Sequence, residues 1–520
     1  MAVAGSGSGR EALRGAIVTS AWTLVSRIAG YARDALLAGV FGMSPILGAL
    51  NLAWMVPNLF RRLFGEGAVA AAIQPALARA EHAGGSAAAH ELFARFHGLL
   101  VWLLGGLALV GGAGLLAAWA LLPAAAEWQE TRRTILFSLV LLPYVVPICL
   151  AALHSSPQNL RGFFFLPALG PVTLNLFWIA ALLWPLPEAS GDPGRAWVVM
   201  IAILIGGVAQ WGMQLPGVRA AGYPLAPRFG RLPPEVRRAV RDFAPALLGL
   251  AAVQLAAVVD QIIVRWLVDS SANSFSYYAN RLLHLPLALV GLSAATGIMP
   301  LLARKAAERD LAGLAEVMRR GTQTLFLLIF AAAAGMYAVA EPVVRALFER
   351  GQFTPDDTRL LTATLHAYLW SLPPAALGAL LVRAYLACGQ YRFQAIAAVL
   401  VVPVNLAGDL LLVPYFGIPG AGWATAGALL VQCLMLVGGL PQLGLPAKLF
   451  RARDFLVLII PGLAAWAAAS ITLLPFGGSA AGVSGLCAAI ATGAAAAVIA
   501  CAFLRPDDFR QVARVFRRKR

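Results

Sequence analysis

The sequence predicts an all-α polytopic membrane protein, and three observations support that prediction. Of its 520 residues, 60% are hydrophobic and only 12% are charged. A soluble domain would carry about 25% charged residues. Apolar stretches of the roughly 20 residues that cross a bilayer recur along the whole chain. An ordinary soluble fold is therefore excluded.

The apolar stretches predict about fourteen transmembrane helices along the chain. The first stretch is too long for a cleavable signal peptide and continues directly into structure. The spans are expected at approximately 13–41, 45–80, 90–122, 132–153, 163–185, 195–216, 242–267, 273–303, 321–347, 360–386, 392–415, 419–440, 454–474 and 481–504.

The distribution of basic residues predicts how these helices are oriented. The net charge is +16, but Lys and Arg concentrate in loops on one side of the spans, so nucleic acid is not an expected partner. The basic segments on that side are 218–241, 304–320, 448–453 and 505–520. The opposite loops at 268–274, 416–418 and 475–480 contain no Lys or Arg. Both termini are therefore predicted to be cytoplasmic. Orientation alone explains the basic tail, and contact with anionic membrane lipids is the alternative.

Three sequence echoes predict that the chain contains two related halves. REALRGAIVTS is echoed by RRAVRDFAPAL from Arg237, IQPALARAE around Pro75 by IMPLLARKA around Pro300, and PVTLNLFWIA around Asn175 by PVNLAGDLLL around Asn405. The three separations agree at about 225 to 230 residues, which chance similarity of apolar helices rarely produces. We therefore predict two six-helix lobes around a central cavity, an arrangement that lets secondary transporters open one site alternately to each side.

The predicted organisation follows from these spans and echoes. It comprises a disordered N-terminus (1–12), an N-terminal lobe of six helices (13–217), a basic cytoplasmic linker (218–241), a C-terminal lobe of six helices (242–441), two further helices (442–504) and a basic cytoplasmic tail (505–520). One loop also predicts a helix start, because Thr354 and Pro355 precede the acidic pair Asp356 and Asp357.

Arginines inside the apolar segments indicate function. Each costs roughly 2.5 to 3.5 kcal/mol at the centre of a membrane helix, so a group of them is expected to line a wet cavity or to pair. In the first span Arg27 and Asp34 share a helical face, whereas Arg33 points roughly 120° away in a straight helix. Gly30 is a candidate hinge that would bring both arginines to one cavity. Asp34 is then expected to orient one of them.

The second span carries further arginines after a predicted kink. Pro57 removes a backbone donor, and Asn58 supports the freed groups. Arg62 and Glu66 have the spacing of a helical ion pair, which favours Arg61 as the ligand-binding cation. The candidate hinges of this span are Pro57, Gly65 and Gly67.

Two carboxylates lie within apolar spans of the C-terminal half. They are Asp260 and Asp409, and Asn405 precedes Asp409 by one helical turn, while Thr425 lies in the following span. Oxygen ligands suit a hard cation such as Na⁺, and intramembrane carboxylates also relay protons. We therefore predict that these four residues form a site for a coupling ion, Na⁺ or H⁺. The alternative is that Asp409 caps its helix or pairs with Arg265.

Two motifs in the chain resemble a known family. SRIAGYARDALLAGVFG followed by VPNLFRRLFGEGAVAAAIQPALA resembles the N-terminal signature of the MurJ (MviN) lipid II flippases of the MOP transporter superfamily, and YYANRLLHLPLALVGLSAATGIMP resembles their eighth helix. The resemblance implies fourteen helices and a transporter rather than an enzyme. It implies alternating-access flipping of lipid II, the undecaprenyl-pyrophosphate-linked peptidoglycan precursor, from the inner to the outer leaflet of the bacterial cytoplasmic membrane. We expect a monomer, with cell-wall synthesis proteins as further partners.

Arginine suits this substrate because its planar guanidinium group binds phosphate and carboxylate oxygens bidentately and stays charged. The headgroup ligands indicated by the residues and by the resemblance are Arg27, Arg33, Arg61 and Arg281. The chain departs from the family pattern at Asn280 and His284, where acids are common, and at Gly48, where aspartate is common. The predicted cavity is therefore more positive, or pH-sensitive through His284.

Two other functions fit parts of the sequence. One is an oligosaccharide-lipid or multidrug exporter of the same superfamily, although an exporter of cationic drugs would be expected to have an acidic cavity. The other is a membrane-embedded lipid-linked sugar transferase, which would need clustered Asp, Glu or His on a loop longer than the roughly 25 residues found here. The five cysteines have no paired spacing, so we predict neither a disulfide nor a bound cofactor.

Overall fold

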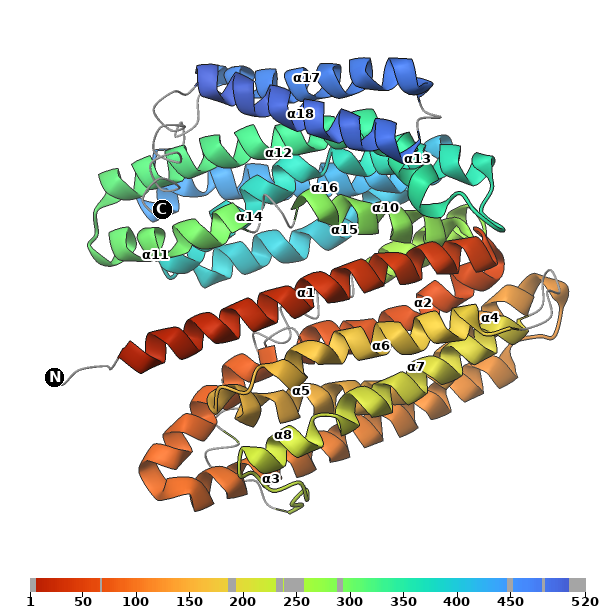
Figure 1. Ribbon diagram of the computed structural model, residues 1–520, viewed down its shortest axis with the longest axis vertical. Helices are drawn as coiled ribbons and strands as arrows, with labels where there is room; N and C mark the ends of the chain where they lie inside the picture. Colours follow the sequence, from red (N-terminus) through yellow and green to blue (C-terminus); the bar gives the residue numbers. More distant parts are fainter. Residues whose placement is uncertain are drawn as a thin grey trace. The chain divides into compact units, whose positions relative to one another are not determined.

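The computed structural model contains helices and no strands in the residues that it describes, which are 6–65, 68–185, 193–230, 237, 257–287, 293–446, 452–478 and 482–504. The chain divides into two compact units, Met1–Val258 and Val259–Arg520. Figure 1 shows the long helices lying side by side within each unit. The predicted all-α class is confirmed.

The first unit is built from long helices joined by short turns. Within it α1 packs on α6, α6 on α7, α3 on α5, and α2 on α4. Its elements are α1 (Ser6–Phe41), α2 (Pro45–Phe60), the π-helix η1 (Arg61–Gly65), α3 (Ala68–Leu121), η2 (Ala126–Trp128), α4 (Gln129–Leu141), η3 (Leu142–Tyr144), α5 (Val145–Leu160), α6 (Phe165–Leu183), α7 (Gly194–Gly212) and α8 (Leu215–Ala220).

The second unit begins at Val259, within helical residues 257–267. In it α15 packs on α16, α13 on α10 and α16, and the last two helices, α17 and α18, pack on each other and on α12. Its further elements are α10 (Ala272–Pro286), α11 (Ser293–Ala307), α12 (Leu311–Phe348), α13 (Pro355–Leu369), α14 (Leu372–Ala387), α15 (Tyr391–Phe416), α16 (Pro419–Gly438), η5 (Leu440–Leu443), α17 (Ala452–Leu473), η6 (Leu474–Phe476) and α18 (Val483–Leu504).

Helix starts follow local sequence chemistry. The Ser44 hydroxyl caps α2 by accepting a hydrogen bond from the backbone N–H of Leu47. At α13, Thr354 and Asp357 form a reciprocal capping box with Pro355 in the first turn, so the helix start predicted there is confirmed. Each cap satisfies donors that a helix N-terminus leaves without an internal partner.

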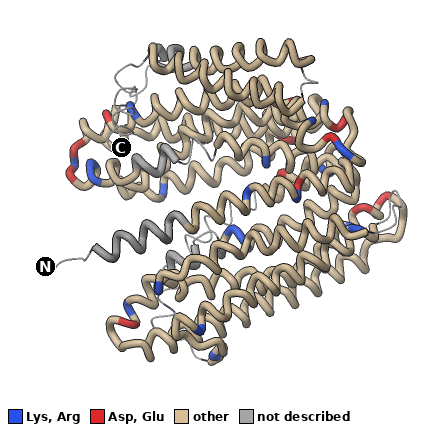
Figure 2. The backbone as a smooth tube through the Cα atoms, viewed as in Figure 1, with Lys and Arg blue, Asp and Glu red and all other residues tan. Residues whose placement is uncertain are grey.

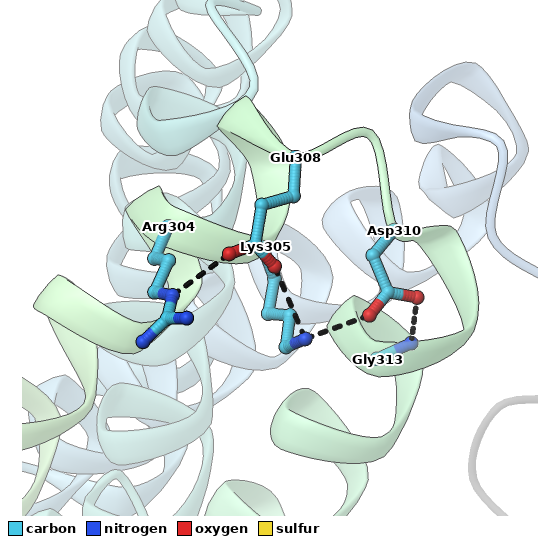
Figure 3. A network of polar contacts seen from close by, with 5 residues as sticks. All are labelled: Arg304, Lys305, Glu308, Asp310 and Gly313. Atoms are coloured by element: carbon cyan, nitrogen blue, oxygen red, sulfur yellow. Dashed lines mark hydrogen bonds and ion pairs between the residues drawn. The ribbon is translucent and has the colours of Figure 1, made fainter.

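The turn between α11 and α12 is held by a surface network of charges (Figure 3). The Asp310 carboxylate caps α12 by accepting from the Gly313 N–H at 2.7 Å, and it also accepts from Lys305 at 2.8 Å. Glu308 pairs with Arg304 at 2.8 Å and with Lys305 at 3.2 Å. The hydrogen bond from Lys305 holds the pKa of Asp310 below its ordinary value, and the hydrogen bond from Arg304 does the same for the pKa of Glu308.

Ten helical stretches of the described residues are long and apolar enough to cross a membrane. They correspond to ten of the predicted spans, so a multi-pass membrane protein is confirmed while the total of fourteen is not established. The other four predicted spans are 13–41, 45–80, 242–267 and 273–303. The helices α2 and α10, which fall in two of these spans, have only 16 and 15 residues. Figure 2 shows the charged residues gathered mainly toward helix ends, with a few on inner stretches.

The N-terminal boundary differs from the sequence prediction. Helix α1 begins at Ser6, so most of the segment 1–12 that was predicted to be disordered is helical. The reason is local, because Glu11, Ala12 and Leu13 favour helix. Residues 1–5 lie outside the described residues.

The predicted linker 218–241 also differs from expectation over its first part. Residues 221–230 pack on the first unit, where Val218, Ala221 and Tyr223 join the core around Phe93. The Arg228 N–H donates to the Ala94 carbonyl at 2.9 Å. This close approach is possible because residue 98 is glycine: an added Cβ would lie 2.2 Å from the Arg228 carbonyl oxygen. The start of the linker is therefore part of the folded lobe.

Candidate functional site

The polar centre of the first unit is built around Arg33. Helix α1 places this side chain against α6, where it is 7% exposed. Its Nε and Nη2 donate to the same carboxylate oxygen of Asp34 at 3.0 and 2.6 Å, and its Nη1 donates to the side-chain oxygen of Asn175 at 3.1 Å. The guanidinium lies 4.4 Å from the ring centroid of Trp178. The guanidinium of Arg33 thus contacts a carboxylate, a side-chain amide and the face of an indole ring.

This arrangement joins α1 to α6 through polar groups in an apolar setting. The amide nitrogen of Asn175 donates to the Ser26 carbonyl at 3.2 Å while its oxygen accepts from Arg33. Asp34 is fully buried. A buried charge pair is stable only when its remaining donors and acceptors are satisfied, and removing one partner typically costs about 3 to 5 kcal/mol. Arg33 therefore holds the helices together in this conformation.

Aromatic side chains surround this polar centre. Trp54 contacts Trp178 edge to face with ring centroids 5.0 Å apart, and it contacts Tyr144 at 5.2 Å. Tyr144 is fully buried and lies within electrostatic range of both Arg33 and Arg61. Tyr144, Trp54 and Trp178 thus form a packed aromatic layer close to both Arg33 and Arg61.

Arg27 lies on a different side of α1 from Arg33. Its side chain is exposed, and so are its neighbours Leu24 and Ile28. The helix continues without a break through Gly30, which is itself buried. The unwound turn expected at Gly30 is absent from this conformation, because an uninterrupted helix keeps residues six apart roughly 120° apart around its axis.

The second arginine segment leaves regular α-helical geometry where the kink was predicted. Pro57 lies inside α2, and the chain turns into a π-helix at Arg61. The side-chain oxygen of Asn58 accepts a hydrogen bond from the Nε of Arg61 at 3.0 Å. Arg61 and Arg62 are both half-buried. A π-helical turn of this kind often marks a functional site.

Part of this segment lies outside the described residues. Glu66, the partner predicted for Arg62, and the candidate hinge Gly67 belong to that part. Gly65 is the last residue of the π-helix.

In the second unit, α10 carries Arg281 together with the two positions at which the chain departs from the family pattern. Arg281 and Asn280 are half-buried, and His284 is exposed. The buried face of α10 includes Asn273, Ser274 and other small or apolar side chains. These three candidate residues thus lie at the border of the buried face.

The structure brings three of the four predicted ion ligands into direct contact in the second unit. The amide nitrogen of Asn405 donates to Asp260 Oδ1 and to Asp409 Oδ2, both at 3.0 Å. Asp260 is 7% exposed and Asp409 is fully buried. The two carboxylates also interact with each other. One neutral amide therefore bridges two buried acids.

Thr425, the fourth predicted ligand, lies beside this cluster without a hydrogen bond to it among those described. It is half-buried on α16, next to the Tyr368 hydroxyl, which lies within electrostatic range of both carboxylates. The alternative partner Arg265 donates to the Ser270 carbonyl and, at 3.4 Å, to Asn273. The second carboxylate oxygen of Asp409, Oδ1, is buried without a hydrogen-bond partner among the described residues. An oxygen-rich set with an unsatisfied carboxylate oxygen fits a hard cation.

Sequence reasoning missed two features of the first unit. Asn175 and Trp178 were quoted for their repeat motif, without a role as partners of Arg33. The signal was available, since Asn175 matches Asn405 in the repeat. The second missed feature is a buried imidazole pair, His97 and His154, whose ring centroids are 4.8 Å apart. A histidine within an apolar span is the signal that would have indicated it.

Comparison with known proteins places these features in a family. A family model described as lipid II flippase MurJ matches residues 37–487. A probable lipid II flippase MurJ of Rhizobium tropici is 31% identical over 419 residues, which cover 79% of this chain and 78% of that protein. A lipid II flippase MurJ of Burkholderia cenocepacia is 29% identical over 472 residues, which cover 88% of this chain and 90% of that protein.

Solved structures share the fold. A lipid II flippase MurJ in an inward closed conformation matches with a TM-score of 0.73 and 22% identity, covering 94% of this chain and 99% of that one. An inward-facing MATE multidrug transporter of the MOP superfamily matches with a TM-score of 0.65 and 14% identity, covering 82% of this chain and 98% of that one. The chain therefore shares its helical fold with both of these transporters.

Proposed function

Because this chain belongs to the lipid II flippase MurJ family, we propose that it moves lipid II from the inner to the outer leaflet of the bacterial cytoplasmic membrane. The observation that carries the proposal is the family match over residues 37–487, which contains Arg61, Arg281 and the carboxylate cluster. The chain is a multi-pass protein of the bacterial inner membrane. We further propose that both termini are cytoplasmic and that the protein acts as a monomer beside cell-wall synthesis proteins.

The substrate explains why cationic side chains are kept on membrane helices. Lipid II carries a pyrophosphate and peptide carboxylates, and an uncompensated charge in hydrocarbon costs several kcal/mol or more. Arg27 is exposed on α1, and Arg61 lies half-buried in a π-helix. Together with Arg281 on α10 they supply the anion-binding groups of the proposed site. The proposed mechanism is alternating access, in which the headgroup site opens in turn to each side of the membrane.

Arg33 has a different part in this proposal. Its guanidinium nitrogens are directed to Asp34 and Asn175, and Trp178 covers one face. Asp34, in turn, orients Arg33 as a carboxylate partner. Arg33 therefore supports the site by fixing α1, while direct headgroup contact is assigned to the other three arginines.

A coupling cation is the second part of the proposal. Asp260, Asn405 and Asp409 offer oxygen ligands in one buried cluster, with Thr425 on the neighbouring helix. Na⁺ suits these ligands, and H⁺ is the alternative ion. A bound cation would offset the repulsion between the two carboxylates. We propose that this binding biases the second lobe between its conformations.

The other exporters of the superfamily are less well supported. The MATE transporters share the fold at 14% identity, whereas the sequence relatives reported above are named lipid II flippases. A lipid-linked sugar transferase would need a cluster of acidic or histidine ligands, and the described residues contain no group of three or more such side chains that could hold a metal.

The decisive experiment measures which lipid-linked intermediate the protein moves. The purified protein is reconstituted in vesicles that contain lipid II, and the fraction of lipid II reaching the outer leaflet is followed over time. The wild type and a variant Arg359→Ala, which alters an exposed surface ion pair, are expected to transport equally. Transport of an O-antigen carrier with lipid II left in place would favour the alternative exporter instead.

A further inference from the structure

Two asparagines occupy equivalent places in the two repeats. Asn175 on α6 and Asn405 on α15 are 230 residues apart and lie in the echoed motifs PVTLNLFWIA and PVNLAGDLLL. Each contacts a charged residue near the start of its own unit. Asn175 contacts Arg33, and Asn405 contacts Asp260, which follows Arg33 by 227 residues. The same helix pair in each repeat is thus joined through an asparagine and a charged side chain.

The charge at this contact is opposite in the two units. Asn175 presents its carbonyl oxygen to the Arg33 guanidinium, whereas Asn405 presents its amide nitrogen to two carboxylates. An amide side chain allows both roles because it carries an acceptor and two donors. The repeated position is therefore the same, but one unit has a cation there and the other has an anion.

The balance of charge also differs. In the first unit the positive charge of Arg33 is paired with the carboxylate of Asp34 at 2.6 Å. In the second unit Asp260 and Asp409 share one neutral amide, and one oxygen of the fully buried Asp409 has no hydrogen-bond partner among the described residues. A buried pair of carboxylates is stabilised when a bound cation or a proton offsets its negative charge. The second unit thus has to bind the positive charge that Arg33 supplies in the first unit.

We propose that the guanidinium of Arg33 is the built-in counterpart, in the first lobe, of the cation bound by the second lobe, and that Asn175 is its positioning residue. This inference rests on the coupling-ion part of the proposed function. Arg33 is tethered, so the first lobe keeps its α1–α6 contact whatever the ionic conditions. In the second lobe the equivalent contact joins two carboxylates, and a bound cation offsets the repulsion between them. The asymmetry confines ion dependence to one half of a pseudo-symmetric transporter.

The inference also separates the roles of the two arginines on α1. Arg33 is directed into the unit, and the uninterrupted helix turns Arg27 to an exposed side. Locking Arg33 against α6 therefore fixes the rotation of α1 and with it the direction of Arg27. Arg33 acts on the headgroup through Arg27 rather than by contact.

Chemical rescue tests the proposal with a readout that does not depend on transport. The variant Arg33→Ala leaves Asp34 and Asn175 facing a guanidinium-sized gap, and we expect its Tm to fall by several degrees in detergent. Methylguanidinium at a low, non-denaturing concentration is expected to restore at least half of that loss and part of the transport rate. The matched control is Arg61→Ala, whose Tm methylguanidinium should leave unchanged. The variant Arg33→Lys keeps the positive charge but lacks the guanidinium group, so its Tm should lie between those of the wild type and Arg33→Ala.

The possible outcomes separate this inference from the function on which it rests. An unchanged Tm for Arg33→Ala with lost transport would overturn it and make Arg33 a headgroup ligand. Equal rescue of Arg33→Ala and Arg61→Ala would overturn it as well. If Arg33→Ala does not fold, Asn175→Ala replaces it, with a smaller fall in Tm expected and an unchanged Tm contradicting the proposal. A wild-type protein that flips lipid II but whose Tm ignores Na⁺ would remove the ion site while leaving the flippase function intact.

Discussion

The side-chain amide of Asn405 donates a hydrogen bond of 3.0 Å to the carboxylate of Asp260, which precedes it by 145 positions in the sequence. The contact crosses between helical residues 257–267 and α15, and the same amide bonds Asp409 one turn further along α15. A single neutral group thus holds two buried acids together. The coupling-ion site proposed above predicts that the stability of the second lobe depends on cations.

The variant Asp409→Asn should abolish most of the sodium dependence of stability. Removing one carboxylate takes away a ligand and also the repulsion that a cation offsets, so the apparent Na⁺ affinity is expected to fall at least about tenfold. The measurement is the Tm of the purified protein as Na⁺ replaces choline at constant ionic strength. Asp356→Asn, at an exposed position, is the control. An identical sodium titration in wild type and Asp409→Asn would contradict the assignment.

The variant Arg27→Ala should lose transport without losing stability. Arg27 is exposed, so truncation removes a charged contact to the headgroup and no internal packing. A hydrogen bond to a charged group contributes about 1.5 to 3 kcal/mol, which corresponds to a roughly 10- to 100-fold loss of lipid II transport. The vesicle assay and the Tm are measured together, with Arg359→Ala as control. A lowered Tm with unchanged transport would assign Arg27 to structure.

The variant Asn58→Ala should weaken substrate binding moderately. The Asn58 oxygen accepts from Arg61 Nε at 3.0 Å and so restrains the guanidinium in the π-helical segment. Loss of one such bond is worth about 0.5 to 1.5 kcal/mol, so the apparent KM for lipid II should rise roughly two- to tenfold. Thr472→Ala, which removes a hydroxyl bonded to the Ala468 carbonyl on α17, is the control. If KM stays constant, Asn58 does not position Arg61 during transport.

The variant Gly98→Leu should detach the start of the linker from the first lobe. Even a Cβ at this position would lie 2.2 Å from the Arg228 carbonyl oxygen, so backbone must shift. Overpacking typically costs about 1 to 3 kcal/mol, and it should lower the Tm and speed tryptic cleavage after Arg228. Gly105→Leu is the matched control, because a Cβ there meets no atom within 4 Å. Equal protease resistance of the two variants would contradict the docked geometry.

Acid should weaken the turn between α11 and α12. The pKa of Asp310 is lowered by the Lys305 ammonium and the Gly313 N–H, and the pKa of Glu308 is lowered by Arg304. A lowered folded-state pKa gives stability that is complete above the unfolded values of about 3.9 to 4.3 and is lost as the pH falls through the folded-state values. The rate of amide hydrogen exchange of residues 311–314, corrected for intrinsic rates, should therefore be higher at pH 3 than at pH 5.

The control for this acid effect is Asp310→Asn. This side chain still caps the helix but is uncharged, so most of the pH dependence of exchange should disappear. Retention of the full pH dependence in Asp310→Asn would show that other groups cause it.

The sequence by itself determined the class of the protein and much of its candidate site. Membrane insertion depends on the hydrophobicity of segments of about 20 residues, which is a local property that can be read along the chain. The position of Asp260 and Asp409 within apolar spans and the helical spacing of Asn405 and Asp409 are likewise local properties, and they predicted the carboxylate cluster. The capping box at Thr354 belongs to the same group, since it involves neighbouring residues alone.

Only the tertiary structure decided which charged side chains meet and which remain exposed. Arg33 contacts Asn175 across 142 positions, and no local pattern distinguishes that contact from one to a ligand. The direction of Arg27 depends on α1 staying helical through Gly30, whereas glycine in a sequence permits either a bend or a continuous helix. The docking of residues 221–230 depends on the absence of a side chain at Gly98, which lies on α3. Burial of polar groups is set by their partners in space, and those partners come from packing between distant segments.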